Sequence, residues 1–199
     1  MYASWLKVHP TSGSGDANVD VTSQQKHSGR VARPAILVWK AANVENEVRN
    51  VLQKGKAEYV DIADAASAPK DGKIVTISGK SNAAKLTFSL GIGNLDISLP
   101  LYYIANSIST ENGKEISGDP GAAAEYDFSI SIDVPENTGT EEKSRQIVVS
   151  DGAGNQDVCL LTLAAGEPYI WIAEGTIELD WEGTPVTIEV KSNTTWTIE

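Results

Sequence analysis

Apolar and polar residues alternate along several short stretches of this chain. The clearest stretch is 128–134, where Phe128, Ile130, Ile132 and Val134 are separated by serine and aspartate. Alternation with a period of two is typical of strands with one buried face. Turn signals rich in Gly, Asn and Asp separate such stretches, at 11–15, 70–72, 111–113, 119–121 and 151–155. The pattern predicts an all-β protein of short antiparallel strands.

Residues 41–56 are the one place where a helix competes with strands. Their valines are spaced like the face of a helix, but the same stretch also fits a hairpin between strands at 36–39 and 47–53. A matching stretch later in the chain, 147–163, has the pattern of a strand, a turn and a second strand. We therefore predict the hairpin.

The chain contains an internal repeat with a period of about 110 residues. Residues 186–193 (VTIEVKSN) repeat residues 75–82 (VTISGKSN) at an offset of 111, with six of eight positions identical. A second pair, 58–62 and 168–172, matches at an offset of 110. Repeats of this length are structural units, so the repeat decides how the domains are assigned.

The repeat is out of phase with the ends of the chain. One copy runs without interruption from about residue 59 to 168, whereas the other is divided into a rear part, residues 1–58, and a front part, residues 169–199. The divided copy has the size of a seven-stranded sandwich. We predict two immunoglobulin-like antiparallel β-sandwiches, one of them split between the N- and C-terminal segments.

Composition and charge exclude several classes of function. The chain is 41% hydrophobic but has no apolar run near the ~20 residues of a membrane span, so we expect a soluble protein without a membrane partner. A net charge of −11 argues against a nucleic-acid binder, which needs a basic face. The N-terminus lacks the features of a signal peptide, so we expect a protein that stays where it is made or a chain without its leader.

Residue types with catalytic or metal-binding chemistry are few and scattered. The single cysteine, Cys159, lies in an apolar run, and we expect it to be buried. His9 and His27 have no cysteine or carboxylate at ligand spacing. The acidic turn 151–157 has oxygen ligands that would suit Ca²⁺, but it lacks the spacing and the final Glu of a calcium loop. We predict no enzymatic activity, no cofactor and no metal site.

The two ends of the chain carry a family resemblance. Residues 190–198 (VKSNTTWTI) resemble the "SN-x-x-W-x-V" strand of the BACON domain, an immunoglobulin-like module common in gut Bacteroidetes and their phages. That family continues to a "W-L-x-V-x-P-x-S-G-x-G" segment, which here stands at the opposite end as residues 5–15 (WLKVHPTSGSG). Joining the two ends would give one uninterrupted BACON domain. The resemblance implies that Trp5 and Trp196 occupy core positions.

Half a sandwich exposes a sheet edge and its core, so we expect the two parts of the divided copy to complete one another. The expected seam consists of Trp5, Leu6, Val8, Ile188, Val190, Asn193, Trp196 and Ile198. The linkers to the intervening copy are short, and a sandwich with an odd number of strands has its ends at opposite poles. This favours exchange between neighbouring chains, as in donor-strand complementation, which closes a ring or builds a filament.

Closure within one chain is the alternative, with the two domains side by side. It needs no partner, and an insertion in the uninterrupted copy at 86–118 could bring the poles together. Within this insertion we expect apolar strands at 95–98 and 101–105. The sequence leaves the choice open.

The resemblance implies two functions for the chain. The first is a non-enzymatic auxiliary, decoration or cement protein of a phage capsid, assembled in the host cytoplasm into the virion, with other copies of itself and capsid proteins as partners. The missing leader favours this reading. The second is a carbohydrate-binding module of a phage head fibre or a bacterial surface protein. We expect Trp39, Trp171 and Trp181 at buried or interface positions rather than on a glycan platform.

Overall fold

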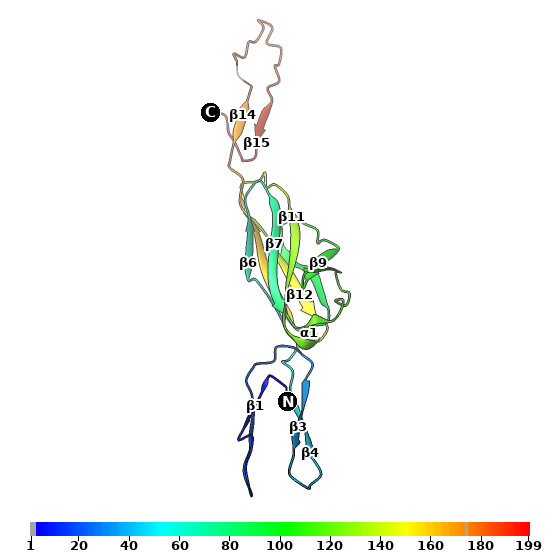
Figure 1. The fold of residues 1–199 in the computed structure, drawn as a ribbon. Helices are drawn as coiled ribbons and strands as arrows, with labels where there is room; N and C mark the ends of the chain where they lie inside the picture. Colours follow the sequence, from blue (N-terminus) through cyan, green and yellow to red (C-terminus); the bar gives the residue numbers. More distant parts are fainter. Residues whose placement is uncertain (1–2, 174) are drawn as a thin grey trace.

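The computed structural model describes residues 3–173 and 175–199, and these form a chain of short β-strands in three parts (Figure 1). A central sandwich (residues 59–168) lies between an N-terminal segment (residues 3–58) and a C-terminal segment (residues 169–173 and 175–199). The two segments extend from opposite poles of the central sandwich. The predicted all-β class with an immunoglobulin-like β-sandwich is confirmed.

The central sandwich consists of two sheets packed face to face. The first has the strand order β10-β9-β11-β7-β5, and the second has the order β6-β13-β12-β8. The strands are β5 (Val60–Ile62), β6 (Ala65–Ala68), β7 (Lys73–Ser81), β8 (Leu86–Gly93), β9 (Tyr102–Ala105), β10 (Ile108–Glu111), β11 (Tyr126–Val134), β12 (Lys143–Asp151) and β13 (Gln156–Leu163). Paired strands are antiparallel except β6 and β13, which are parallel. A one-turn helix, α1 (Pro120–Ala123), precedes β11.

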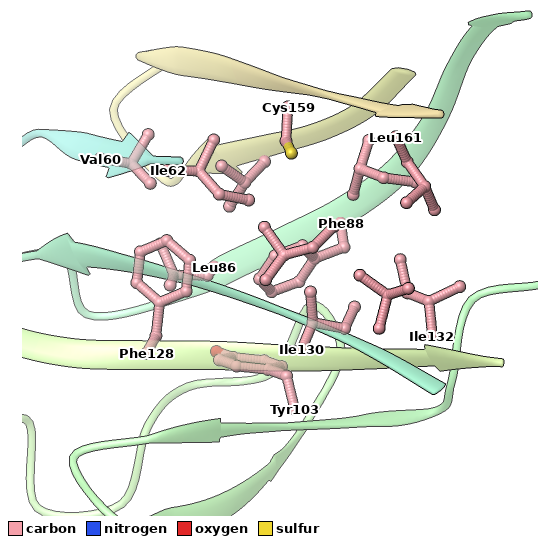
Figure 2. Packing of buried hydrophobic residues seen from close by; sticks show 14 of the residues in the cluster. Val60, Ile62, Leu86, Phe88, Tyr103, Phe128, Ile130, Ile132, Cys159 and Leu161 are labelled. Atoms are coloured by element: carbon pink, nitrogen blue, oxygen red, sulfur yellow. The ribbon is translucent and has the colours of Figure 1, made fainter. Parts of the chain in front are cut away.

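Alternation along the strands places every second side chain in the core between the sheets. In β11 every second residue from Tyr126 to Val134 is buried. Phe88 lies against Tyr103 and Phe128, with ring centroids 5.0 and 5.9 Å away (Figure 2). Tilted and edge-to-face rings at such distances attract one another beyond the area that they bury.

The chain enters the central sandwich through a segment that changes sheets. β5 pairs with β7, and β6 pairs with β13 in the other sheet. At the crossing the amide of Ala63 donates to the carbonyl of Ser78 at 3.0 Å, and the amide of Leu160 donates to the carbonyl of Asp64 at 2.9 Å. One entering segment therefore covers one edge of both sheets.

The insertion at 86–118 contains β9, as predicted, but the strand expected at 95–98 is wrong. After β8 the amides of Asn94 and Leu95 both donate to the carbonyl of Ser144, at 2.8 and 3.0 Å. These bonds hold the chain at one point of β12 instead of along its length. The Leu95 side chain enters the core, where it is 1% exposed. The apolar pattern there reflects a buried loop.

The N-terminal segment is made of two hairpins with a small shared core. The hairpins are β1 (Leu6–His9) with β2 (Asp20–Ser23), and β3 (Arg33–Trp39) with β4 (Glu47–Gln53). The predicted hairpin is thus confirmed over the helix. The buried apolar residues of the core that the two hairpins share are Trp5, Leu6, Ala35 and Leu37.

The C-terminal segment forms one hairpin, between β14 (Ile170–Ile172) and β15 (Val190–Ser192). None of its described residues is buried. Isolated two-stranded hairpins are at best marginally stable in water.

Cys159 lies in the core of the central sandwich with no exposed surface, as expected (Figure 2). Burial raises the pKa of its thiol to about 11, so the neutral thiol persists at pH 8. We predict that a thiol reagent such as Ellman's reagent leaves the native protein unmodified at pH 8 but titrates one thiol in urea. A Ser89→Cys variant, with an exposed thiol, is the positive control. Rapid modification of the native chain at Cys159 would contradict this packing.

Candidate functional site

The C-terminal segment repeats the first strands of the central sandwich in the same register. Its pairs are Ile170 with Ser192, Trp171 with Lys191 and Ile172 with Val190. The pairs of β5 and β7 are Val60 with Ser81, Asp61 with Lys80 and Ile62 with Gly79. Each pair in the C-terminal segment consists of the residues 110 and 111 positions after those of its counterpart. The sequence repeat is therefore also a repeat of backbone geometry.

A Ser-Asn pair fixes the entering chain in both copies. In the central sandwich, the Ser81 hydroxyl donates to the Tyr59 carbonyl at 2.7 Å, and the Asn82 side-chain oxygen accepts from the Tyr59 amide at 3.0 Å. In the C-terminal segment, Ser192 and Asn193 make the same two bonds to Tyr169, at 2.8 and 2.9 Å.

The same asparagines join each copy to the part before it. The Asn82 side-chain amide donates to the carbonyls of Ala57 and Ser28, at 3.1 and 3.2 Å. The Asn193 amide donates to the carbonyls of Glu167 and Thr138, at 3.0 and 2.9 Å. Because the two sets of partners differ by 110 positions, both poles of the central sandwich carry the same type of junction.

The junction with the N-terminal segment has an additional ion pair. The Arg30 guanidinium binds the Asp119 carboxylate through two hydrogen bonds, which raises the pKa of Arg30 and lowers that of Asp119. The Arg30 amide also donates to the carbonyl of Gly121 at 2.9 Å. A Cβ at Gly121 would overlap the backbone of Asn82, so glycine permits this close approach. The position that matches Arg30 in the second junction is Thr140.

Positions that are buried in the central sandwich are exposed in the C-terminal segment. The inward-facing positions of β5 and β7 include Val60, Ile62, Val75 and Ile77, which are 8, 2, 6 and 1% exposed. Their counterparts are Ile170, Ile172, Val186 and Ile188, which are 53, 48, 50 and 42% exposed. The same apolar pattern therefore has a core to cover in one copy and none in the other.

The described part of the N-terminal segment repeats the later strands of the central sandwich. β3 and β4 pair Arg33 with Gln53, just as β12 and β13 pair Lys143 with Leu163, 110 positions later. In the central sandwich β7 pairs with β11, and β8 pairs with β12. In the described part of the N-terminal segment, β2 and β3 have no such neighbours.

An open hollow of about 570 Å³ lies beside these uncovered strands. Its apolar lining includes Val8, Val19, Leu37 and Trp39. Trp39 is 39% exposed, whereas the matching Val149 is fully buried. The hollow therefore lies where the central sandwich has its core, on the side of β3 that matches the buried Val149.

The structure places the expected seam residues at both poles of the molecule (Figure 1). Trp5 and Leu6 are buried and Val8 is half-buried in the N-terminal segment. In the C-terminal segment Val190 and Asn193 are half-buried, whereas Ile188, Trp196 and Ile198 are exposed. The chain does not bring the two groups together. Asn193 binds the central sandwich of its own chain, a role that sequence reasoning missed although Asn82 shares its motif.

The other candidate sites have structural explanations. The acidic turn at 151–157 joins β12 to β13, and one oxygen of the Asp151 carboxylate accepts from the amides of Ala153 and Asn155, at 2.9 and 2.8 Å. The His27 ring donates to the Val31 carbonyl at 2.6 Å. Across residues 3–173 and 175–199, no group of three or more His, Cys, Asp or Glu is placed to hold a metal. No helix within those ranges is long and apolar enough to cross a membrane.

Comparisons with known proteins give only remote similarities. No family model matches the chain, and no curated protein matches it. A Bacteroides thetaiotaomicron protein whose structure was determined by NMR is 10% identical, with a TM-score of 0.29, over 56% of this chain and 91% of that one. Zebrafish RET cadherin-like domains 1 to 4 are 12% identical, with a TM-score of 0.35, over 84% of this chain and 42% of that one. These values are too low to extend any property of either protein to this chain.

The two junction asparagines allow a matched pair of substitutions. We predict that Asn82→Ala lowers the free energy of unfolding by about 2–3 kcal/mol, because buried backbone groups lose their partners. Asn193→Ala, at the half-buried junction, should cost less than about 1 kcal/mol in the unassembled chain. Urea unfolding followed by circular dichroism measures both. Equal losses would show that the two junctions do not differ in burial as described.

Proposed function

We propose that this chain is a non-enzymatic structural protein whose copies join head to tail by exchanging strands. The C-terminal segment of one copy completes the divided sandwich with the N-terminal segment of the next. The observation that carries the proposal is the match between the two poles. The C-terminal segment presents apolar side chains at positions that face inward in the central sandwich, but it has no core to cover. The N-terminal segment presents an uncovered apolar hollow beside strands that, in the central sandwich, pair with the strands that the C-terminal segment repeats.

The central sandwich is the template for the joint. In this template residues 185–188 of one chain lie beside β2 of the next, as Ile74–Ile77 lie beside Ile130–Asp133, and β14 lies at the outer edge, as β5 does. Residues 197–199 then reach the Trp39 end of β3, because they match Leu86–Phe88, which pair with Val149–Asp151 at the end of β12. Full burial of each large apolar side chain contributes ~1.5–3 kcal/mol, and the open edges gain ladder hydrogen bonds.

The contact is heterologous, because one copy's C-terminal segment meets the next copy's N-terminal segment. Both poles of the central sandwich carry the same Ser-Asn junction. Each sandwich therefore follows the previous one by a similar rotation and translation. Repetition of such a step builds a filament, or a ring if the rotation closes.

A phage virion is the setting that we propose for this assembly, with the chain as an auxiliary or decoration protein of the capsid. The support is the BACON-type resemblance of residues 5–15 and 190–198, a family whose members include structural proteins of crAss-like phages. The net charge of −11 suits this setting, because it keeps exposed copies soluble and repels nucleic acid.

Carbohydrate binding is the second candidate function, and the exposed ring of Trp181 is the observation that favours it. An exposed indole can stack on a sugar ring as well as on a protein. A glycan array with the monomeric chain separates the two functions. Specific binding that is lost in Trp181→Ala would favour the glycan module, whereas absence of binding would leave strand exchange as the explanation of this tryptophan.

Light scattering coupled to size-exclusion chromatography tests the strand exchange. We expect species larger than the 21.2 kDa chain that grow with concentration. Ile188→Asp should return the protein to a monomer, because it places a charge at an inward position. Trp171→Asp should assemble normally, because the matching outward position already carries Asp61. A folded monomer of wild-type protein at every concentration would overturn the proposal.

A further inference from the structure

Trp181 is the most exposed large apolar side chain among the described residues, at 92%. It lies in the turn before β15. The amide of Gly183 donates to the carbonyl of Asp180 at 3.2 Å, just as the amide of Gly72 donates to the carbonyl of Pro69 at 2.9 Å. Gly72 and Gly183 also share a positive φ, of 71° and 77°. The two turns match at an offset of 111, so Trp181 occupies the position of Lys70.

Lys70 joins the turn to the far pole of the central sandwich. Its carbonyl accepts from the amide of Asn137 at 2.7 Å, and its ammonium lies 3.3 Å from the carboxylate of Glu167. Glu167 belongs to the linker that leaves the sandwich. The side chain at this position of the turn therefore faces the junction between one sandwich and the next.

The residues that match these two partners lie 110 positions earlier, at His27 and Ala57. The loop around each of these positions has the same form in both internal repeats. The His27 ring donates to the carbonyl of Val31 at 2.6 Å, and the Asn137 side-chain amide donates to the carbonyl of Glu141 at 2.7 Å. The described part of the N-terminal segment thus presents the kind of surface that receives such a turn in the central sandwich.

We propose that Trp181 of one copy docks against Ala57 and the loop around His27 of the next copy. This contact rests on the strand exchange proposed above, and it identifies the partner surface as the junction between the N-terminal segment and the central sandwich of that copy. The Lys70–Glu167 ion pair is replaced on both sides at once, by an indole and a methyl group. A carboxylate at position 57 would face the indole instead of the ammonium that Lys70 supplies in the central sandwich, whereas alanine leaves apolar room for the ring.

The surface around Ala57 suits an indole. Ala57 itself is exposed. The neighbouring Lys56 ammonium lies 3.6 Å from the centroid of the Tyr59 ring, so aliphatic, aromatic and cationic groups lie close together. Buried tryptophans are among the residues on which the affinity of an interface most depends. Ala57 lies where the N-terminal segment joins the central sandwich. The contact therefore holds the incoming C-terminal segment to both of these parts.

A charge exchange between the two positions tests this contact. Trp181→Lys and Ala57→Glu should each weaken assembly about tenfold, as expected for loss of a central aromatic contact. The double variant should bind about threefold more tightly than the sum of the two single losses predicts, because it recreates the ion pair of the central sandwich. The gain is small because exposed ion pairs add little energy. Sedimentation velocity over a concentration series measures the dissociation constants. Both residues are exposed in the single chain, so circular dichroism should show unchanged folding.

Trp171→Lys combined with Ala57→Glu is the matched control, because the matching position Asp61 faces outward. Its effects should simply add. If the losses from Trp181→Lys and Ala57→Glu also add without recovery, the docking of Trp181 is overturned while strand exchange stands. If wild-type chain shows no association, the proposed function itself is overturned. Recovery in the double variant confirms the contact, since residue 181 is in the C-terminal segment and residue 57 in the N-terminal segment, and these segments extend from opposite poles of the central sandwich (Figure 1).

Discussion

The structure depends on one constraint: a β-sandwich protects its core only when both sheets are complete at the edge where the chain enters. In the central sandwich, one entering segment meets this need by pairing β5 with one sheet and β6 with the other. The N-terminal segment has the later strands without this cover, and its core is reduced to Trp5, Leu6, Ala35 and Leu37. The described C-terminal segment contains the counterparts of part of β5 and β7, and none of its described residues is buried.

Strand periodicity and the repeat carry most of the fold. Alternation along 128–134 predicts β11, and comparison of the two copies decides for the hairpin of β3 and β4 over a helix. The failure at 95–98 has a physical cause, because an apolar pattern reports burial and not hydrogen-bond pairing. Leu95 is buried, but its backbone is held by Ser144 and not by a strand along β12. Pairing partners distant in sequence leave no mark in a local pattern.

The candidate site is only partly accessible from the sequence. Inward and outward positions follow from alternation, so Ile188 could be assigned to the seam. The role of Asn193 could not, because its carbonyl partners are backbone atoms that any residue type supplies. The conserved spacing of Lys-Ser-Asn in both copies was nevertheless a usable signal, since an identical polar pair at a strand end indicates identical backbone contacts.

The choice of partner follows from how the two internal repeats of the chain differ. A surface that received an unrelated strand would need only an open edge and an apolar hollow. Its residues would not have to match those of the central sandwich. Here the divided copy departs from the complete one in a compensated way, with Trp181 at the position of Lys70 and Ala57 at that of Glu167. Paired changes of this kind keep two surfaces complementary, and here the two positions belong to the C-terminal and N-terminal segments, which extend from opposite poles of the central sandwich. A second chain of this protein carries both changes together, which is why we propose it as the partner and propose a head-to-tail direction for the assembly.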